Sequence, residues 1–379
     1  MNHSLGQPPP RCPYRLSALA LVVMVSACRP PPPTPPPEPA PPLPGPILRM
    51  EPVAGDTAEA VFAMDPVTLG TTLVYRARSP SPTQSLVVPG SSPQRRAVRL
   101  DRGSLSGPLT VDLRRGFSIA LRVRIDGQGD LLGSAGASNG MIVAVGNGYS
   151  DGFRIQADTP RRRLTFSIGR PAAPYSVSVV SPPVEFGRWL DIVATWDGHV
   201  MRLYVDGWLV AERAMTASYT VPARNILTIG YANAGVGSLN MAFERAELFT
   251  QALSPSACLR LLVPDVVPTA EFVELWDSLA VAARRSKATE EELAQLDALR
   301  SAADALPITF RLAARRLEAE LASQHRNTAR AADAYLDLCD HASAPSGWSD
   351  GAREELRRFL REGATAGWSP ALLDRLAGS

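Results

Sequence analysis

Several residue types are scarce in this chain of 379 residues, and each scarcity narrows what the protein can do. The four histidines are scattered over the chain, and no Cys-x-x-Cys or cysteine–histidine pairing suggests a structural zinc site. Lys287 is the only lysine among 39 basic residues, a bias that indicates a GC-rich genome rather than nucleic-acid binding. We therefore expect no nucleic-acid partner.

Long apolar runs are lacking too. The run from Leu16 to Val25 follows a short basic region and is too short to span a bilayer as a stable helix, so residues 1–28 read as a secretion signal. The signal ends in Val25-Ser-Ala-Cys28, which resembles the lipobox of bacterial lipoproteins. The resemblance implies that Cys28 is lipidated and begins the mature protein; an ordinary signal with a chance cysteine is the alternative. Because no Asp follows Cys28, it implies an outer-membrane anchor, facing the periplasm or the surface.

Residues 29–46 contain twelve prolines and no apolar pattern that could be buried. Such a segment favours extended polyproline II, at about 3.1 Å per residue, and would reach roughly 50 Å. We predict a stalk between the lipid anchor and the folded part, with a docking site for proline-binding domains as the alternative.

Net charge is near zero but unevenly divided. Residues 95–264 carry nineteen arginines against thirteen acidic residues, whereas residues 265–379 carry fourteen basic residues against nineteen acidic ones. Opposite signs predict that the two parts dock against each other. The run from Arg161 to Arg163 follows Pro160 and is interpreted as a solvated turn rather than a polyanion site.

The clearest pattern lies between Trp189 and Glu212. Apolar residues alternate in two stretches, 190–196 and 201–205, and each is followed by an Asp-Gly pair, which favours a tight hairpin turn. Alternating stretches also occur at 117–125, 141–145, 153–157, 164–168 and 175–180, with turn residues between them. This spacing predicts an antiparallel two-sheet sandwich, mainly β, over residues 47–264, clear from about residue 85.

The motif Trp189-x-x-Ile-Val-x-Thr-Trp-Asp-Gly, continued by Leu203-Tyr-Val-Asp-Gly-Trp208, resembles the central signature of laminin G-like, concanavalin A-type jelly rolls. The resemblance covers roughly residues 85–262. It implies a jelly-roll fold, but such sandwiches host lectins, adhesion modules, glycosidases and spacers alike.

After Pro264 the composition and the period change to those of helices. Capping signals and apolar spacing predict helices over about 269–286, 289–306, 309–341 (with a break near Asn327), 348–363 and a short one from Ser369, so residues 265–379 form a small α-helical domain. Cys258 and Cys339 remain in the mature chain. In an oxidising compartment they permit a disulfide between the two domains, and buried free thiols are the alternative.

Catalytic patterns are not found. Glycosidases of this fold carry paired carboxylates on one strand, as in Glu-x-Asp-x-Glu, and this triplet is absent. The nearest candidates, Glu244 and Glu247, are three residues apart, and strict alternation would place them on opposite faces of their strand. We therefore expect a protein that is not an enzyme.

Binding residues are expected in the loops between strands. The richest loops carry Asp130, Asn147, Tyr149, Asp151, Tyr231 and Asn233. An aromatic ring beside carboxylates and amides suits a sugar, and the same carboxylates suit Ca²⁺; ordinary turns are the alternative. The resemblance implies calcium less strongly, because the closing strand reads Phe243-Glu244 where relatives often have Asp-Glu.

These observations predict a lipoprotein of the bacterial cell envelope, anchored in the membrane, whose sandwich binds a glycan or an envelope protein. A structural or assembly lipoprotein, in which sandwich and helical domain form a protein-interaction platform, is the alternative. A glycoside hydrolase is a distant third.

Overall fold

A computed structural model describes residues 38–46, 48–52, 62–64, 74–77, 87–100, 103–128, 139–146, 149–215, 218–230, 239–284, 288–341, 346–362 and 368–378. Of these, the segments from residue 38 onward belong to one compact unit, residues 37–379. The predicted signal and Cys28 lie outside the described residues, so lipidation stays a prediction. No helix among the described residues is long and apolar enough to cross a membrane.

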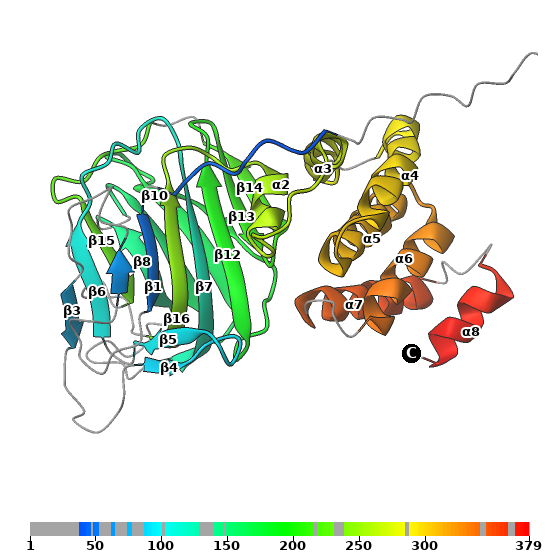
Figure 1. Ribbon diagram of the computed structural model, residues 1–379, viewed down its shortest axis with the longest axis horizontal. Helices are drawn as coiled ribbons and strands as arrows, with labels where there is room; N and C mark the ends of the chain where they lie inside the picture. The colour runs from blue at the N-terminus through cyan, green and yellow to red at the C-terminus, as the bar shows by residue number, and fades with distance from the viewer. Residues whose placement is uncertain are drawn as a thin grey trace, which may run out of the picture. The chain divides into compact units, whose positions relative to one another are not determined.

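Two antiparallel sheets form the sandwich (Figure 1), as predicted. In the nine-stranded sheet the order is β14-β13-β12-β7-β16-β1-β2, with β5 also pairing with β16 and β4 pairing with β5. Its strands are β1 (Leu48–Pro52), β2 (Phe62–Met64), β4 (Val87–Pro89), β5 (Arg96–Arg99), β7 (Phe117–Gln128), β12 (Trp189–Trp196), β13 (Val200–Val205), β14 (Trp208–Ala214) and β16 (Leu239–Phe249).

The seven-stranded sheet faces it, in the order β11-β10-β9-β8-β15-β6-β3. Its strands are β3 (Val74–Ala77), β6 (Gly103–Pro108), β8 (Asn139–Val145), β9 (Phe153–Asp158), β10 (Arg163–Gly169), β11 (Ser176–Val180) and β15 (Ile226–Gly230). Nearly every strand expected from alternation is present with closely matching bounds.

The core between the sheets is built from the alternate residues that the pattern indicates. Trp196 is 1% exposed and lies 6.0 Å from Phe117 and 5.9 Å from Tyr219, measured between ring centroids. The meander is confirmed as β12, β13 and β14, and both Asp-Gly turns are present. At the second turn Asp206 and Gly207 take φ values of 52° and 75°, the left-handed region that this type of turn requires.

The outer face of the nine-stranded sheet is covered by helix α2 (Pro255–Arg260). Tyr204 and Phe249 on the sheet pack there against Cys258 and Leu261, all of them buried. Gly207 also allows this helix to come close, because a Cβ at this position would lie 3.1 Å from Leu259. Covering this face explains why β12 to β14 bury apolar side chains on both sides.

The remaining helices follow as the sequence predicts, with adjusted ends: α3 (Ala270–Ala282), α4 (Glu290–Asp304), α5 (Ile308–Gln324), α6 (Thr328–Asp340), α7 (Ser346–Arg361) and α8 (Pro370–Gly378). The long helix is broken where expected, because Arg326 takes a φ of 62° and Asn327 caps α6. Phe272, Trp276 and Phe310 are buried in the core of the helical part, and Trp208 of the sandwich joins the same apolar cluster.

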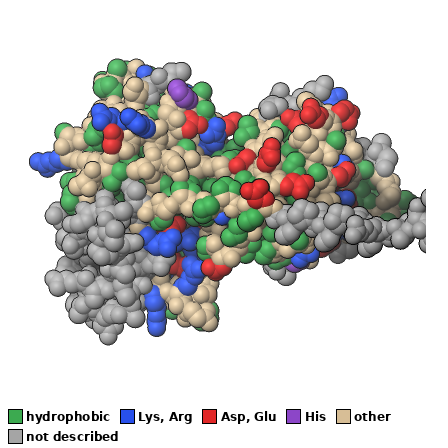
Figure 2. Space-filling model, turned by 45° about the horizontal axis from the view of Figure 1, so that its top comes forward, with side chains coloured by type: hydrophobic (Ala, Val, Ile, Leu, Met, Phe, Trp, Pro, Cys, Tyr) green, Lys and Arg blue, Asp and Glu red, His purple; other side chains and the backbone are tan. Residues whose placement is uncertain are grey.

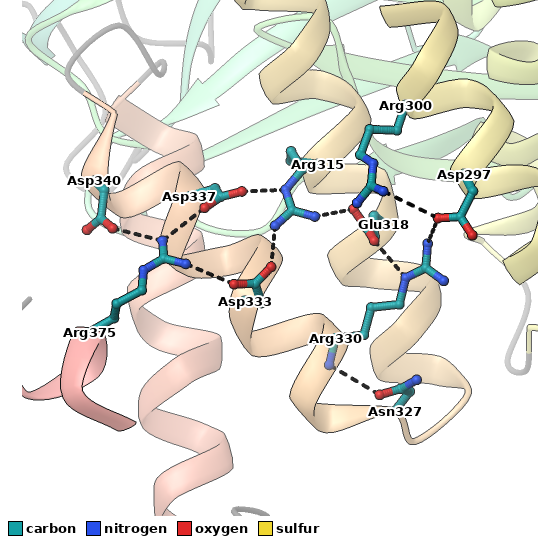
Figure 3. A network of polar contacts seen from close by, with 10 residues as sticks. All are labelled: Asp297, Arg300, Arg315, Glu318, Asn327, Arg330, Asp333, Asp337, Asp340 and Arg375. Carbon is teal, nitrogen blue, oxygen red and sulfur yellow. Dashed lines mark hydrogen bonds and ion pairs between the residues drawn. The ribbon is translucent and has the colours of Figure 1, made fainter. Parts of the chain in front are cut away.

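A network of arginines and carboxylates links four of these helices, α4, α5, α6 and α8 (Figure 3). Arg315 of α5 bonds Glu318, Asp333 and Asp337. Arg375 of α8 reaches Asp333, Asp337 and Asp340 at 2.8, 2.9 and 3.0 Å. Two residues of α6, Asp333 and Asp337, therefore each bind both arginines and connect α6 to α5 and to α8.

The end of the predicted stalk differs from expectation. Pro39 forms an antiparallel bridge with Thr269, and the Ala40 amide donates to the Pro268 carbonyl at 2.8 Å. Ala40 is 5% exposed, and Leu43 packs against the apolar cluster over the nine-stranded sheet. The two apolar residues among the last prolines, which the composition alone predicts as spacer, are thus docked, and any free stalk ends before residue 38.

Neither of the two remaining cysteines forms a disulfide, so the bridge that the sequence permitted is not present. Cys258 lies in the cluster under α2, whereas Cys339 lies against Ser349, whose carbonyl oxygen is 3.8 Å from the Cys339 sulfur. The two side chains belong to different apolar clusters, which is why they do not meet.

Candidate functional site

The binding loops that the sequence predicts are described only in part. Asp130, Asn147, Tyr231 and Asn233 lie outside the described residues, so their role stays a prediction. Tyr149 and Asp151 are described and belong to the connection between β8 and β9.

Backbone hydrogen bonds fix this connection in place. Gly152 takes a φ of 66°, and its amide donates to the Thr220 carbonyl at 2.9 Å. A Cβ on Gly152 would lie 1.8 Å from the Val145 carbonyl oxygen, so only glycine fits this turn. These contacts hold the backbone that follows Tyr149 in place.

Two exposed tyrosines meet at this edge. The Arg170 amide donates to the carbonyl oxygens of both Tyr149, at 3.2 Å, and Tyr175, at 2.8 Å. Their side chains are 56% and 57% exposed, the largest exposures among the aromatic residues that the structure describes. Our sequence reasoning missed Tyr175, because it assigned that residue to a strand; the structure starts β11 one residue later, at Ser176.

Beneath Tyr149 lies Arg154, which the sequence reasoning also missed. Its guanidinium carbon is 3.9 Å from the centroid of the Tyr149 ring, a cation–π contact. Phe153, Ile155 and Ala157 of β9 point into the core, so Arg154, Gln156 and Asp158 project from the opposite, outer face of the seven-stranded sheet. The alternation Phe-Arg-Ile-Gln-Ala-Asp was the signal that could have identified them.

Small polar residues flank Arg154 across the sheet. In the strand register, Ser167 of β10 lies beside it, and Ser178 of β11 lies beside Ser167, with the two hydroxyls 2.8 Å apart. On the other side come Ala144 of β8 and Thr228 of β15. The outer face thus presents short hydroxyl side chains around one long basic residue.

Arg154 and Gln156 are each only 6% exposed, and neither side chain has a hydrogen bond to a described residue; Arg154 Nε is fully buried without one. Buried polar groups are normally paired, because an unpaired one costs roughly 1–3 kcal/mol. Asp158 differs, since it accepts bonds from the amide and the guanidinium of Arg161. Two buried polar side chains with unused donors, beside two exposed rings, are the elements of a site for a polar ligand.

A second cluster of charges lies on the outer face of the nine-stranded sheet. Arg122 pairs with Asp191 at 2.7 Å and Glu244 at 3.3 Å, while Arg245 pairs with Asp191 at 3.5 Å and Glu247 at 3.9 Å. Burial raises the pKa of Asp191 to about 6, although both arginines act in the opposite direction. The three carboxylates are held by arginines on a face that α2 helps to cover.

This cluster corrects one prediction. Strict alternation predicts Glu244 and Glu247 on opposite faces, but both join arginines of the outer face. The register of β16 against β7 shifts between Phe243 and Arg245, so a bulge breaks the alternation at this point. The pair is on one face, but each carboxylate is neutralised by ion pairs.

No group of three or more histidine, cysteine, aspartate or glutamate side chains that could hold a metal ion occurs within the described ranges. The calcium prediction rests on loops that include Asp130 and Asn147, outside those ranges. Of the loop carboxylates that we predicted as calcium ligands, Asp151 is the one that the structure describes.

Residues 101–257 match the model of the concanavalin A-like lectin/glucanases superfamily, in agreement with the resemblance seen in the sequence. The sandwich is thus a concanavalin A-like, laminin G-like domain. No curated protein matches the chain by sequence.

Solved structures similar to the chain include receptor-binding parts of clostridial neurotoxins. One is the binding domain of botulinum neurotoxin DC in complex with SialylT, at 13% identity and a TM-score of 0.42. Another concerns botulinum neurotoxin type C, whose cell entry depends on interaction with two ganglioside molecules, at 13% identity and a TM-score of 0.44. Both alignments cover 58% of this chain and 51% of the other, so the chain spans about half the length of these structures.

Proposed function

We propose that this protein is a lipid-anchored, non-catalytic protein of the bacterial cell envelope whose sandwich binds a glycan on the outer face of the seven-stranded sheet. The observation that carries the proposal is the pair of buried polar side chains, Arg154 and Gln156, which have no hydrogen bond to a described residue and lie beside the exposed rings of Tyr149 and Tyr175. Sugars are recognised by aromatic rings, which cover their apolar side, and by fixed polar groups, which bind their hydroxyls.

The composition of the site favours an acidic glycan. A guanidinium offers five donors and no acceptor, and it forms its strongest bonds with carboxylates and similar anions. Gln156 and the hydroxyls of Ser167, Ser178 and Thr228 would serve the neutral hydroxyls of the same ligand. A uronic or sialic acid unit fits this set better than a neutral glucan.

The test is binding of the full chain to immobilised oligosaccharides, with acidic sugars and their reduced, neutral forms side by side. Replacing Arg154 with Ala should abolish the preference for the acidic forms, and replacing Tyr149 with Ala should weaken binding to both. Val267, an apolar residue 57% exposed outside this sheet face, gives a control when replaced with Ala. Equal binding by the wild type and both site variants would refute the proposal.

The anchor is tested separately. Cys28→Ser should prevent labelling by a palmitate analogue and release the protein from the membrane fraction, because several acyl chains on one cysteine suffice for stable anchoring. Labelling that persists in this variant contradicts the lipoprotein part and leaves the glycan site untouched.

The assembly alternative draws support from the surface charges. Figure 2 shows acidic side chains gathered over the helical part of the visible face. If the glycan test fails, capture of a basic envelope protein by this acidic surface becomes the better explanation. Hydrolysis is not proposed, because the arginines that bind Glu244 and Glu247 would oppose both proton donation and nucleophilic attack.

A further inference from the structure

A cleft of about 530 Å³ lies where the sandwich meets the helices. On the sandwich side it is lined by the segment 182–185 and by Arg162, Arg188 and Asp206; on the helical side by Arg316, Trp348, Gly351 and Glu354. This volume lies within the range of small-molecule sites. None of these residues belongs to the sheet face proposed above for glycans.

Most charges in the cleft are already paired. Arg188 bonds Asp206 at 2.7 Å and lies 3.7 Å from Glu185. Glu354 pairs with Arg361 at 3.0 Å. These groups hold one another and leave little free capacity for a ligand.

Arg316 is different. Its guanidinium packs against two tryptophans, 4.4 Å from the ring centroid of Trp208 and 5.4 Å from that of Trp348. Its guanidinium has one long ion pair, with Glu320 at 3.8 Å, and no side-chain hydrogen bond to a described residue. Burial lowers the pKa of Arg316 to about 10, so the group keeps its charge at neutral pH.

Arg162 provides a second guanidinium on the opposite wall. Its backbone is held, with a φ of 53° and its carbonyl oxygen 2.6 Å from the Val184 amide, but its side chain has no ion pair or hydrogen bond among the described residues. Guanidinium groups on both walls of the cleft therefore have hydrogen-bond donors that no described residue accepts from.

We propose that this cleft binds a small organic anion with a single carboxylate on an apolar body, gripped between Arg162 and Arg316. Pro182, Pro183 and Val184 supply an apolar wall for the body of the ligand. Glu185 and Glu354 also line the cleft, so a doubly charged phosphate would be repelled. Because its walls come from both parts of the chain, an occupied cleft would hold the helices against the sandwich.

The test is calorimetric titration of the full chain with hexanoate, with hexanamide as the uncharged match and inorganic phosphate as the alternative anion. Hexanoate should bind saturably, and hexanamide and phosphate at least about tenfold more weakly. Arg311 lies exposed on the same helix as Arg316 and outside the cleft, so Arg311→Gln should leave binding unchanged.

Three variants should each weaken hexanoate binding about tenfold or more: Arg316→Gln, Arg162→Gln and Gly351→Met. Gly351 lies in α7 with nothing within 4 Å of an added Cβ, so a methionine there fills the cleft without disturbing the fold. This variant keeps the test decisive if Arg316→Gln fails to fold. The proposal is overturned if hexanamide or phosphate binds as well as hexanoate, if no saturable binding occurs, or if Arg162→Gln and Gly351→Met both bind like the wild type.

Discussion

Trp196 is the residue whose replacement tests the core of the sandwich most directly. It is 1% exposed, lies in register with Phe117 and contacts the rings of Phe117 and Tyr219. Trp196→Ala removes this whole contact area from a packed interior, which costs on the order of 3 to 5 kcal/mol. A loss of this size is a large part of the stability of an ordinary domain.

The indole nitrogen makes the prediction sharper. Trp196 Nε1 is buried and has no hydrogen-bond partner among the described residues. An unpaired buried donor costs about 1–3 kcal/mol, and Trp196→Phe removes that cost together with part of the ring. We therefore expect the phenylalanine variant to lose well under half as much stability as the alanine variant.

Hydrogen exchange measured by mass spectrometry can report this without unfolding the whole chain, because exchange from central strands follows the opening of the sandwich. In the alanine variant, exchange in β7 and β12 should accelerate by about a hundredfold to several thousandfold, at 1.4 kcal/mol per factor of ten. Helices α4 to α6 belong to another apolar cluster and serve as the internal reference. Equal acceleration in the alanine and phenylalanine variants would refute the reasoning about the indole nitrogen, and unchanged exchange in both would refute the burial of Trp196.

Three further perturbations test other contacts. The pKa of Asp191 is raised to about 6 in the fold, so the folded state binds the proton of this carboxyl group more tightly than the unfolded state does. The free energy of unfolding should therefore fall by on the order of 2–3 kcal/mol between pH 4 and pH 7. In urea unfolding, Asp191→Asn should flatten this part of the pH profile. Arg375→Ala should raise amide exchange in α8 with little effect on α5, by no more than a few-fold, because this arginine is 37% exposed and such pairs are worth about 1 kcal/mol or less. Ala40→Glu should release the docked segment before residue 46, seen as faster hydrogen exchange of the Ala270 amide, which donates to the Glu38 carbonyl at 2.9 Å; unchanged exchange of this amide would contradict the expected release.

The sandwich could be predicted from the sequence because apolar and polar residues alternate along its strands and its turns carry Asp-Gly pairs. These local patterns were enough for the strands around Trp196. The shared face of Glu244 and Glu247 could not be predicted, because a bulge depends on the partner strand and does not change the alternation in the sequence. Cys258 and Cys339 could be judged only once their separate apolar clusters were known.

The candidate glycan site could also be predicted only in part from the sequence. Tyr149 was found because it is aromatic and lies in a turn-rich loop, whereas Arg154 looked like one more outward residue of a half-buried strand. Its importance comes from two properties that pairing and packing create: it is almost fully buried, and it has a ring above it but no hydrogen-bond partner in the described chain.

Arg316 and Arg154 share this condition although they lie in different structural environments. Each is an arginine packed against aromatic rings without a short bond to a carboxylate, since Arg316 has only Glu320 at 3.8 Å, whereas Arg122 and Arg375 bind carboxylates at 2.7 and 2.8 Å. In a chain whose basic residues are almost all arginine, the presence of a guanidinium therefore says little about function, and the absence of a short bond to a carboxylate says more. The two sites should respond independently: Arg154→Ala should leave hexanoate binding intact, and Gly351→Met should leave glycan binding intact. Loss of both activities in either variant would mean that the two parts of the chain are coupled.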